Sequence, residues 1–427
     1  MKKNQFKRLS VLFLLVVLFI RCDDKIIETY IANVPVYLSY EEFRASVKSE
    51  EPINLNRPGK IYFYQNYLFI NEYLKGIHVI DNNNPSSPEN IAFISIPGNV
   101  DMAIKDDVLY ADSYIDLVAL DISDISDIEV LSRKEDIFPY VLPPYDEDYR
   151  VDEIDYEKGI VIDWELKKIT EEIEQRNYPV YPWLKDGFYM SNAYSQGNPR
   201  YSPDNSSIGV GGSMARFTIK NNALYIIDNH SLKVFDIGDY NDILIANTLY
   251  TGWNIETLFP YGNHLFIGSQ NGVMIYDISN PFYPEFISDH WHITSCDPVV
   301  VEGNYAYVTL RSGNLCGALD DRLEVLDISD IINPVLIKSY TMDEPYGLGI
   351  DNSVLFVCDG ASGLKVYDAT DKLNITDNML ARFNTIQAYD VIPFNDVLML
   401  IGDDGFHQYD YSDINEIELL STIPVNN

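Results

Sequence analysis

The sequence has few basic side chains for its size. Among its 427 residues, 30 Lys and Arg stand against 65 Asp and Glu, and the formal net charge at pH 7 is −35. A surface of this charge repels nucleic acid and anionic lipid head groups, so we expect no nucleic-acid partner. It leaves open the binding of cations and of basic partners.

Motifs that carry catalytic chemistry are missing as well. The chain contains no HExxH, CxxC, GxSxG or GxxxxGK[ST] pattern, and the glycine-rich stretch GVGGS at 209–213 has no lysine with which a phosphate-binding loop holds its ligand. His290 and His292 could meet one metal ion, because residues i and i+2 of a strand share a side, but only if a third ligand such as Asp297 turned inward. The sequence therefore predicts no cofactor and no metal site, and it assigns no catalytic residue.

The chain also lacks an apolar run long enough to span a bilayer. Its N-terminal run Val11 to Ile20, VLFLLVVLFI, is too short for that and follows Lys2, Lys3, Lys7 and Arg8, which is typical of a signal peptide. We therefore predict a signal peptide at 1–21 and a tether at 22–57, followed by the folded part at 58–427.

Cys22 closes this apolar region and is followed by two aspartates. The arrangement resembles the lipobox of bacterial lipoproteins, although Arg21 replaces the small residue that usually precedes the cysteine. The resemblance implies that Cys22 carries a lipid, through which alone the protein would meet a membrane. The acidic pair is similar to tags that direct lipoproteins to the cell surface. We expect an exported protein on the outer membrane or cell surface, with a periplasm-facing position as the alternative.

Cysteine is scarce, with four residues in the chain. Cys296 and Cys316 flank a predicted hairpin that turns at Gly303 and Asn304, so they lie at the same end of it. In an oxidising compartment they could form a disulfide or remain free thiols. Cys358, in the strand-like segment VLFVC, is expected to be a small buried apolar residue.

An apolar segment that ends in Asp recurs seven times, mostly at intervals of about 40 residues. A turn signal of Asn or Asp followed by a short apolar strand precedes each segment, as Asn66 precedes YLFIN. Each unit therefore predicts four short strands. The segments end at Asp81, Asp121, Asp236, Asp277, Asp327, Asp368 and Asp410.

Four-stranded units of this length indicate a β-propeller, because each sheet needs a neighbour on either side to cover its faces. We predict an all-β, seven-bladed β-propeller of four-stranded blades. A parallel β-helix or an open solenoid is the alternative. The strings LVALD, LKVFD, LEVLD and LKVYD resemble the LVIVD-repeat family of exported bacterial β-propellers, and the resemblance spans 58–427 apart from one insertion. It implies the propeller fold and export but no particular activity.

The repeated Asp has a structural explanation. Its carboxylate can accept a hydrogen bond from the backbone N–H two residues later, which closes an Asx turn at the corner to the fourth strand. Cation binding is the functional alternative. These corners, however, lack the alternating ligands and the glycine of a calcium loop.

Two irregularities interrupt the repeat. Residues 141–213 form an insertion between the second and third units, which begins with an acidic stretch and ends in a tract rich in Tyr, Asn, Ser, Pro and Gly. We expect a solvated flap with one or two strands; a lid, a docking arm or an eighth blade are the alternatives. The second irregularity is the longer loop at 311–322 in the fifth unit. Successive strands of a unit alternate in direction, so both irregularities lie on the side of the links between blades. Insertions gathered on one side commonly mark the binding side of a repeat protein.

Polar and aromatic residues close to that side form the candidate binding face. Arg311 stands out because it is a guanidinium in an acidic protein; it could clamp a carboxylate or a sugar acid, or pair with Asp320 or Asp321. The full candidate set is Asp101, Tyr114, His292, Asp297, Arg311, Tyr346, Asp359 and Asp390.

These patterns favour a non-catalytic binding or assembly module that is exported, lipid-anchored and presents its loop-rich side to a protein or glycan partner at the cell envelope. The alternative is a hydrolase or lyase that uses carboxylates and His292 on that side as acid and base. A third possibility is a purely structural subunit of an envelope complex.

Overall fold

The computed structural model describes residues 26–173, 208–252, 254–291, 298–312 and 320–426. The predicted signal peptide and the lipid-anchor residue Cys22 lie outside the described residues. The chain divides into two compact units. The small unit contains Met1–Leu38 and Pro143–Tyr189, and the large unit contains Ser39–Leu142 and Met190–Asn427.

The large unit is built from antiparallel sheets, and seven of the sheets in the described residues contain four strands that follow one another in the chain. The first is β3 (Pro58–Tyr64), β4 (Tyr67–Glu72), β5 (Gly76–Asp81) and β6 (Glu89–Ser95), with β2 (Lys48–Glu50) and β13 (Val210–Gly211) added at its edges. The second is β7 (Met102–Lys105), β8 (Val108–Ser113), β9 (Asp116–Asp121) and β10 (Glu129–Lys134). The third is β14 (Phe217–Lys220), β15 (Ala223–Ile227), β16 (Ser231–Asp236) and β17 (Leu244–Tyr250).

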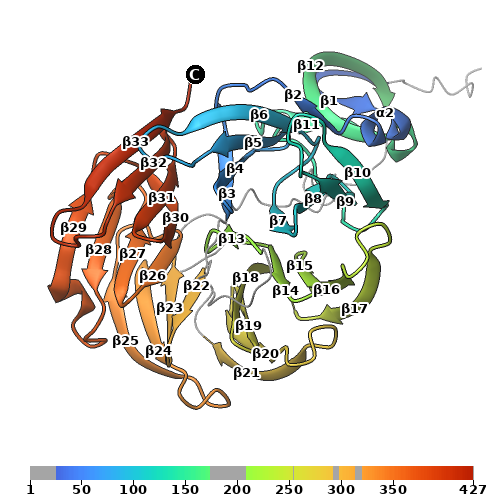
Figure 1. The fold of residues 1–427 in the computed structure, drawn as a ribbon. Coiled ribbons are helices and arrows are strands. Elements are labelled where there is room, and N and C mark those ends of the chain that lie inside the picture. Colours follow the sequence, from blue (N-terminus) through green and yellow to red (C-terminus); the bar gives the residue numbers. More distant parts are fainter. Residues whose placement is uncertain (1–25, 174–207, 253, 292–297, 313–319, 427) are drawn as a thin grey trace, which may run out of the picture. The chain divides into compact units, whose positions relative to one another are not determined.

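Four further sheets repeat the same order toward the C-terminus (Figure 1). The fourth is β18 (Ile255–Tyr261), β19 (His264–Ser269), β20 (Gly272–Asp277) and β21 (Glu285–Trp291). The fifth is β22 (Val299–Glu302), β23 (Tyr305–Leu310), β24 (Arg322–Asp327) and β25 (Val335–Thr341). The sixth is β26 (Leu348–Asp351), β27 (Val354–Cys358), β28 (Leu364–Asp368) and β29 (Met379–Phe383), with the 3-10 turn η3 (Ile375–Asn378) before β29. The seventh is β30 (Ala388–Phe394), β31 (Val397–Gly402), β32 (Gly405–Asp410) and β33 (Glu418–Pro424).

The first strands of these sheets contact one another in chain order, from β3 through β7, β14, β18, β22 and β26 to β30. Apolar side chains bridge the sheets: one buried cluster joins the first three sheets, and another joins the fourth, fifth and sixth. A further cluster packs Ile61 and Ile70 of the first sheet with Ile392 and Phe406 of the seventh. The prediction of an all-β chain of four-stranded antiparallel sheets is confirmed.

All seven repeated aspartates close the Asx turn that the sequence predicts. In each case a carboxylate oxygen accepts a hydrogen bond of 2.7–2.9 Å from the backbone N–H two residues later. The side-chain hydroxyl and then the backbone N–H of the Ser or Thr two residues later lower the pKa of the carboxyl groups, because the ionised form is the better acceptor; this holds for Asp121, Asp277, Asp327, Asp368 and Asp410. The links between sheets leave from the opposite end, which we call the link side.

Every sheet of the repeat also carries a β-bulge between its third and fourth strands. Ile287 and Ile337, which lie at two of these bulges, are partly buried against the core cluster of the fourth to sixth sheets. A bulge increases the local twist of an edge strand and so hinders pairing with another chain. The repeated sequence gives no signal for this feature.

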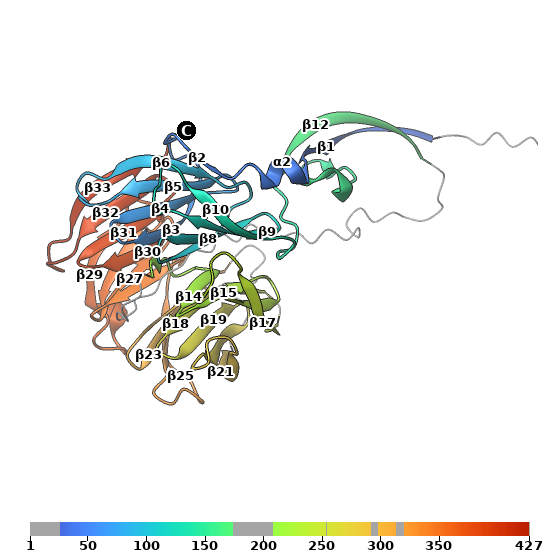
Figure 2. The same ribbon diagram turned by 45° about the vertical axis from the view of Figure 1, so that its right-hand side comes forward.

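The small unit pairs the N-terminal segment with the insertion. Strand β1 (Ile26–Leu38) runs antiparallel to β12 (Ile160–Ile173) and parallel to β11 (Arg150–Val151), and the 3-10 turn η1 (Tyr156–Lys158) precedes β12 (Figure 2). Asn33 of β1 is buried and donates hydrogen bonds of 2.8 Å to the carbonyl oxygens of Asp146 and Tyr149. Residues 26–38, expected as part of a tether, are thus the partner strand of the insertion.

Residues 39–57 belong to the large unit. The helix α2 (Tyr40–Arg44) begins with a capping box between Ser39 and Glu42, and it buries Phe43 against the ring of Tyr114, with 5.9 Å between ring centroids. Within the described residues, no helix has the length and apolar character needed to cross a membrane.

The contact between the seventh and first sheets departs from the repeat at two positions. Gln408 stands where LKVFD has Val234, and Asn82 stands where the next residue of most repeats is isoleucine, such as Ile237. The two buried amides hydrogen bond to each other at 2.8 and 2.9 Å, and Gln408 also donates to the carbonyl oxygen of Pro85 at 3.1 Å. This amide pair therefore ties the two ends of the repeated sequence together.

We predict that Gln408→Val lowers the free energy of unfolding by about 1–3 kcal/mol, because it leaves the buried amide of Asn82 without its partner. The double variant Gln408→Val with Asn82→Ile restores the repeat at both positions and should recover most of the loss. Urea unfolding measures both. A double variant as unstable as the single one would contradict this account of the junction.

Candidate functional site

The segment from Ile208 to Arg216 runs along the innermost strands of the large unit. Val210 and Gly211 pair with Phe63 and Tyr62 of β3. Farther along, the carbonyl oxygen of Ala215 accepts a hydrogen bond of 2.8 Å from the N–H of Leu258 in the fourth sheet. The same segment therefore contacts sheets that are distant in sequence, which places it in the middle of the unit.

Glycine is required where this segment approaches β3. A Cβ atom on Gly209 would lie 2.2 Å from a ring carbon of Tyr62, and one on Gly211 would lie 3.0 Å from the same ring. The N–H of Gly209 donates to the carbonyl oxygen of Ile104 at 3.1 Å, and the Tyr62 hydroxyl donates to the Gly209 carbonyl at 3.1 Å. The GVGGS stretch is thus a close-packed core segment rather than a ligand-binding loop.

A buried ion pair lies beside this segment. The ammonium group of Lys60 is 2.8 Å from the carboxylate of Asp101 and donates to the carbonyl oxygen of Met214 at 3.0 Å. Burial lowers the pKa of Lys60, although the Asp101 carboxylate opposes this effect. A buried pair of this kind fixes geometry more than it adds stability, because both charges lose their hydration.

Two further carboxyl groups are buried close by. Asp112 accepts hydrogen bonds from the N–H groups of Val100 and Asp101 at 2.8 and 3.0 Å, and burial raises its pKa to about 6. Asp390 accepts from the Ser213 hydroxyl at 3.4 Å, and burial raises its pKa well above the ordinary value. Its second oxygen has no hydrogen-bond partner within the part of the chain that the structure describes. These side chains are shielded from solvent, so they hold the centre together and are not exposed to a ligand.

The structure buries four residues of the predicted binding face. Asp101 and Asp390 lie in the central cluster, and Tyr114 packs on Phe43. Asp359 pairs with the ammonium group of Lys365 and accepts hydrogen bonds from the loop before β26. Buried side chains cannot present a surface to a macromolecule, so these four contribute to the fold.

Arg311 and Tyr346, by contrast, come together. The guanidinium carbon of Arg311 lies 4.0 Å from the centre of the Tyr346 ring, which stands 4.9 Å from the ring of Tyr389. Cys358 is buried, as predicted. The remaining candidates lie outside the described residues: His292, Asp297 and the predicted cysteine pair Cys296 and Cys316.

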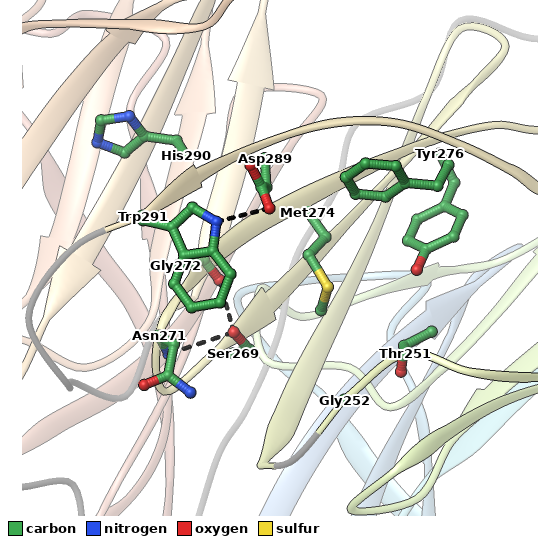
Figure 3. Close-up of a pocket in the computed structure, with 11 residues that line it drawn as sticks. Thr251, Gly252, Ser269, Asn271, Gly272, Met274, Tyr276, Asp289, His290 and Trp291 are labelled. Carbon is green, nitrogen blue, oxygen red and sulfur yellow. Dashed lines mark hydrogen bonds between the residues drawn. The ribbon is translucent and has the colours of Figure 1, made fainter.

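An open cavity of about 250 Å³ lies on the outer strands β20 and β21 and reaches Thr251 at the end of β17 (Figure 3). Its most prominent side chain is Trp291, which is 69% exposed and donates its indole N–H to the Asp289 carboxylate at 2.6 Å. At the other end, Tyr276 packs edge to face with Phe286, at 5.6 Å between centroids. Aromatic side chains with a few placed polar groups are the usual lining of a ligand site.

The sequence did not point to these residues. They lie on strands, where apolar and aromatic residues usually indicate core, and only the pairing of β20 with β21 brings them together. One signal in the sequence could have indicated the site: a tryptophan, Trp291, is the last residue of the fourth sheet's outer strand, next to the link to the fifth sheet.

A second cavity, of about 650 Å³, lies between the first and second sheets. Its carboxylates already have partners in the fold: Asp107 accepts from the Tyr64 hydroxyl at 3.0 Å, and Asp124 accepts from the Ser126 N–H at 3.0 Å. We take the Trp291 cavity as the candidate site, because its lining includes two exposed aromatic side chains, Trp291 at 69% and Phe286 at 54%.

Comparison with known sequences identifies the repeat. Residues 59–92, 258–289 and 295–342, in the first, fourth and fifth sheets, match the sequence model of the LVIVD repeat. The predicted LVIVD repeat is thus confirmed in these three units. No curated protein matches the sequence.

Solved structures show a similar fold at low sequence identity. A protein from Lactobacillus plantarum has a TM-score of 0.50 and 11% identity, over 86% of this chain and 96% of that one. BamB from Moraxella catarrhalis has a TM-score of 0.47 and 8% identity, over 90% of this chain and 97% of that one. PorZ, a surface component of the type-IX secretion system of Porphyromonas gingivalis, has a TM-score of 0.47 and 12% identity, over 89% of this chain and 40% of that one. At these identities the likeness concerns the fold alone.

We predict that Asp112→Asn stabilises the protein at pH 8 but not at pH 4. The folded pKa of Asp112 is raised from 3.8 to about 6, so between these values the unfolded chain loses a proton that the folded chain keeps. The wild type therefore loses stability as the pH rises from 3.8 to about 6, by roughly 3 kcal/mol in total, and the loss is complete above that range. Asparagine retains the acceptor for Val100 and Asp101 and removes the ionisation.

Urea unfolding of the wild type and of Asp112→Asn at pH 4, 6 and 8 measures this difference, with the exposed Asp239→Asn as the matched control. A gap between wild type and Asp112→Asn that stays constant with pH would show that Asp112 is not the group responsible.

Proposed function

We propose that this protein of LVIVD repeats is a binding module for a protein or glycan partner at the cell envelope. Its seven four-stranded sheets form one closed seven-bladed propeller, with 141–213 as an insertion between the second and third blades. The chain is exported and held at the membrane by a lipid on Cys22. The observation that carries the binding role is the cavity beside Trp291.

The contacts between sheets support a closed ring. Inner strands touch in chain order, β31 of the seventh sheet contacts β3 of the first, and the amides of Gln408 and Asn82 join the same two sheets. A closed arrangement leaves no sheet face of the repeat uncovered and fewer exposed edges.

The cavity supports a binding role because its aromatic surface is both exposed and fixed. An exposed Trp loses rotamer freedom when a partner covers it, and this cost is smaller when the side chain is already held in place, as the Asp289 carboxylate holds Trp291. One end of the cavity, at Gly272 and Trp291, lies at the link side, from which the 141–213 insertion and the loop at 311–322 also leave the sheets. Binding surfaces of repeat proteins are commonly built on the side that carries such insertions.

We predict that Trp291→Ala reduces partner capture by about tenfold or more, as expected for loss of a central aromatic anchor. Immobilised full-length protein is exposed to solubilised envelope, and retained protein and carbohydrate are quantified. Tyr283→Ala is the control, because Tyr283 is 58% exposed in the turn between β20 and β21 but is not among the residues that line the cavity. Equal loss in both variants, or in neither, would place the binding site elsewhere.

We predict that Cys22→Ser abolishes incorporation of a labelled fatty acid and releases the protein from the membrane fraction of a Gram-negative host. The buried Cys358→Ala should keep both properties. The readouts are gel fluorescence of the label and fractionation. A wild-type protein that is exported without the label would refute lipid anchoring while leaving the binding role untouched.

A further inference from the structure

The cavity is organised by the alternation of β20. Gly272, Met274 and Tyr276 project to the same side of the strand, because every second residue of a strand shares a side. The spacing from Gly272 to Tyr276 is four residues, which corresponds to about 13 Å along the strand. The surface is therefore elongated.

Strand β21 supplies the second row. Trp291 pairs with Gly272, Asp289 with Met274, and Phe286 with Tyr276. Figure 3 shows the same order in space, with Trp291 at one end, Met274 between and Tyr276 at the other end. The result is an aromatic surface at each end, with a thioether and a carboxylate between them.

Packing alone does not explain Trp291. Gly272 is required by the backbone, since it has a φ of +144° and a Cβ there would lie 2.1 Å from the His290 carbonyl oxygen. A tryptophan opposite a glycine can fill the missing side chain, but it would then be covered, and Trp291 is 69% exposed.

The repeat does not impose these residues either. The positions that match Trp291 in the pairing of four other sheets hold Ser95, Tyr250, Thr341 and Pro424. The positions that match Asp289 in the same sheets hold Phe93, Thr248, Ser339 and Thr422. A residue needed for the fold of each unit would recur, and the pair of Trp and Asp is specific to the fourth sheet of this set.

The charge of the site limits the ligand. Among the lining residues that the structure describes, Asp289 is the one carboxylate and none is Lys or Arg, and the chain as a whole carries −35. Anionic ligands such as acidic polysaccharides are therefore repelled. A small cation would be bound best by rings that face one another around it, whereas the rings of Trp291 and Tyr276 lie at opposite ends of this surface.

The remaining features suit hydroxyl groups attached to an apolar ring face. The indole N–H of Trp291 is already used by Asp289, so the ring offers its face, against which the C–H bonds of a pyranose can lie. Asn271 carries both donors and an acceptor, and the Asp289 carboxylate accepts from hydroxyl or amide groups. Because the two aromatic ends are about 13 Å apart, more than one sugar residue is needed to cover both.

We infer that the cavity on β20 and β21 is a subsite for an uncharged oligosaccharide, which stacks on Trp291 at one end and on Phe286 at the other, the two side chains of the lining that are 69% and 54% exposed. The inference rests on the proposed binding function and names its ligand class. Trp291 and Phe286 are the contact residues, and Asp289 both positions the indole and accepts a hydrogen bond from the sugar.

Titration of the purified full-length chain with defined oligosaccharides tests the inference. The probes are neutral oligomers of glucose, mannose, xylose and N-acetylglucosamine, with oligogalacturonate as the acidic comparison and choline as the cationic one. Tryptophan fluorescence and calorimetry are the readouts. We expect binding of at least one neutral oligomer, tighter for longer oligomers than for the monosaccharide, and no binding of oligogalacturonate.

Variants locate the site. Trp291→Ala should weaken this binding by about tenfold or more, and Trp291→Phe by less, because it keeps an aromatic face. Asp289→Asn keeps an acceptor for the indole N–H and should bind better than Asp289→Ala. Tyr283→Ala should bind as the wild type does. Unchanged melting of each variant shows that the fold is intact.

The outcomes separate this inference from the proposed function. If no neutral oligomer binds but envelope capture still depends on Trp291, the inference of an oligosaccharide ligand is overturned, and the proposed binding module recognises a protein. Saturable choline binding that Trp291→Ala removes would also overturn it. Loss of both glycan binding and Trp291-dependent capture would overturn both proposals.

Discussion

Each four-stranded sheet of the large unit has two apolar faces, and only neighbouring sheets can cover them. The buried clusters accordingly span sheets rather than lying within them, as in the cluster shared by the first three. The first and seventh sheets, at the two ends of the repeated sequence, also cover each other, because Ile61 of the first sheet packs with Ile392 of the seventh. Without that junction two apolar faces would stand in water, at a cost of about 25 cal/mol for each Å².

Features that a short stretch of sequence determines could be predicted. The strands and the seven Asx turns are of this kind, because an Asp and the N–H two residues later close the turn without any distant contact. The β-bulges could not be predicted, since they depend on the register between two strands. The pairing of β1 with β12 was missed for a similar reason: the two strands are far apart in sequence and lie outside the repeat.

Departures from the repeat acquire meaning only when the neighbours are known. Gln408 is a polar residue at an apolar position, and Asn82 replaces an isoleucine, so either alone would count as a buried defect. Together they satisfy each other across the junction. The glycines at 209 and 211 similarly suggested a loop, whereas they allow a segment to lie against the ring of Tyr62.

The candidate site was the hardest part to predict. From the sequence, charged residues near the links between sheets were predicted to form the binding face. In the structure, Asp101, Asp359 and Asp390 instead make hydrogen bonds inside the fold. The segment 208–216 also lies along inner strands, where it pairs with β3 and hydrogen bonds to the second and fourth sheets. The outer strands face solvent, and there a side chain that the fold does not require remains available for recognition.

The contrast between the polar central cluster and the aromatic cavity on β20 and β21 bears on the proposed binding role. With a net charge of −35, its long-range potential excludes anions but does little to select among neutral ligands. Selectivity must therefore come from contacts at short range, where a fixed ring face and oriented acceptors discriminate by shape and by hydrogen bonding. In the proposed site Trp291 would meet this requirement, because its indole N–H already donates to the Asp289 carboxylate, which reduces the ordering cost of binding.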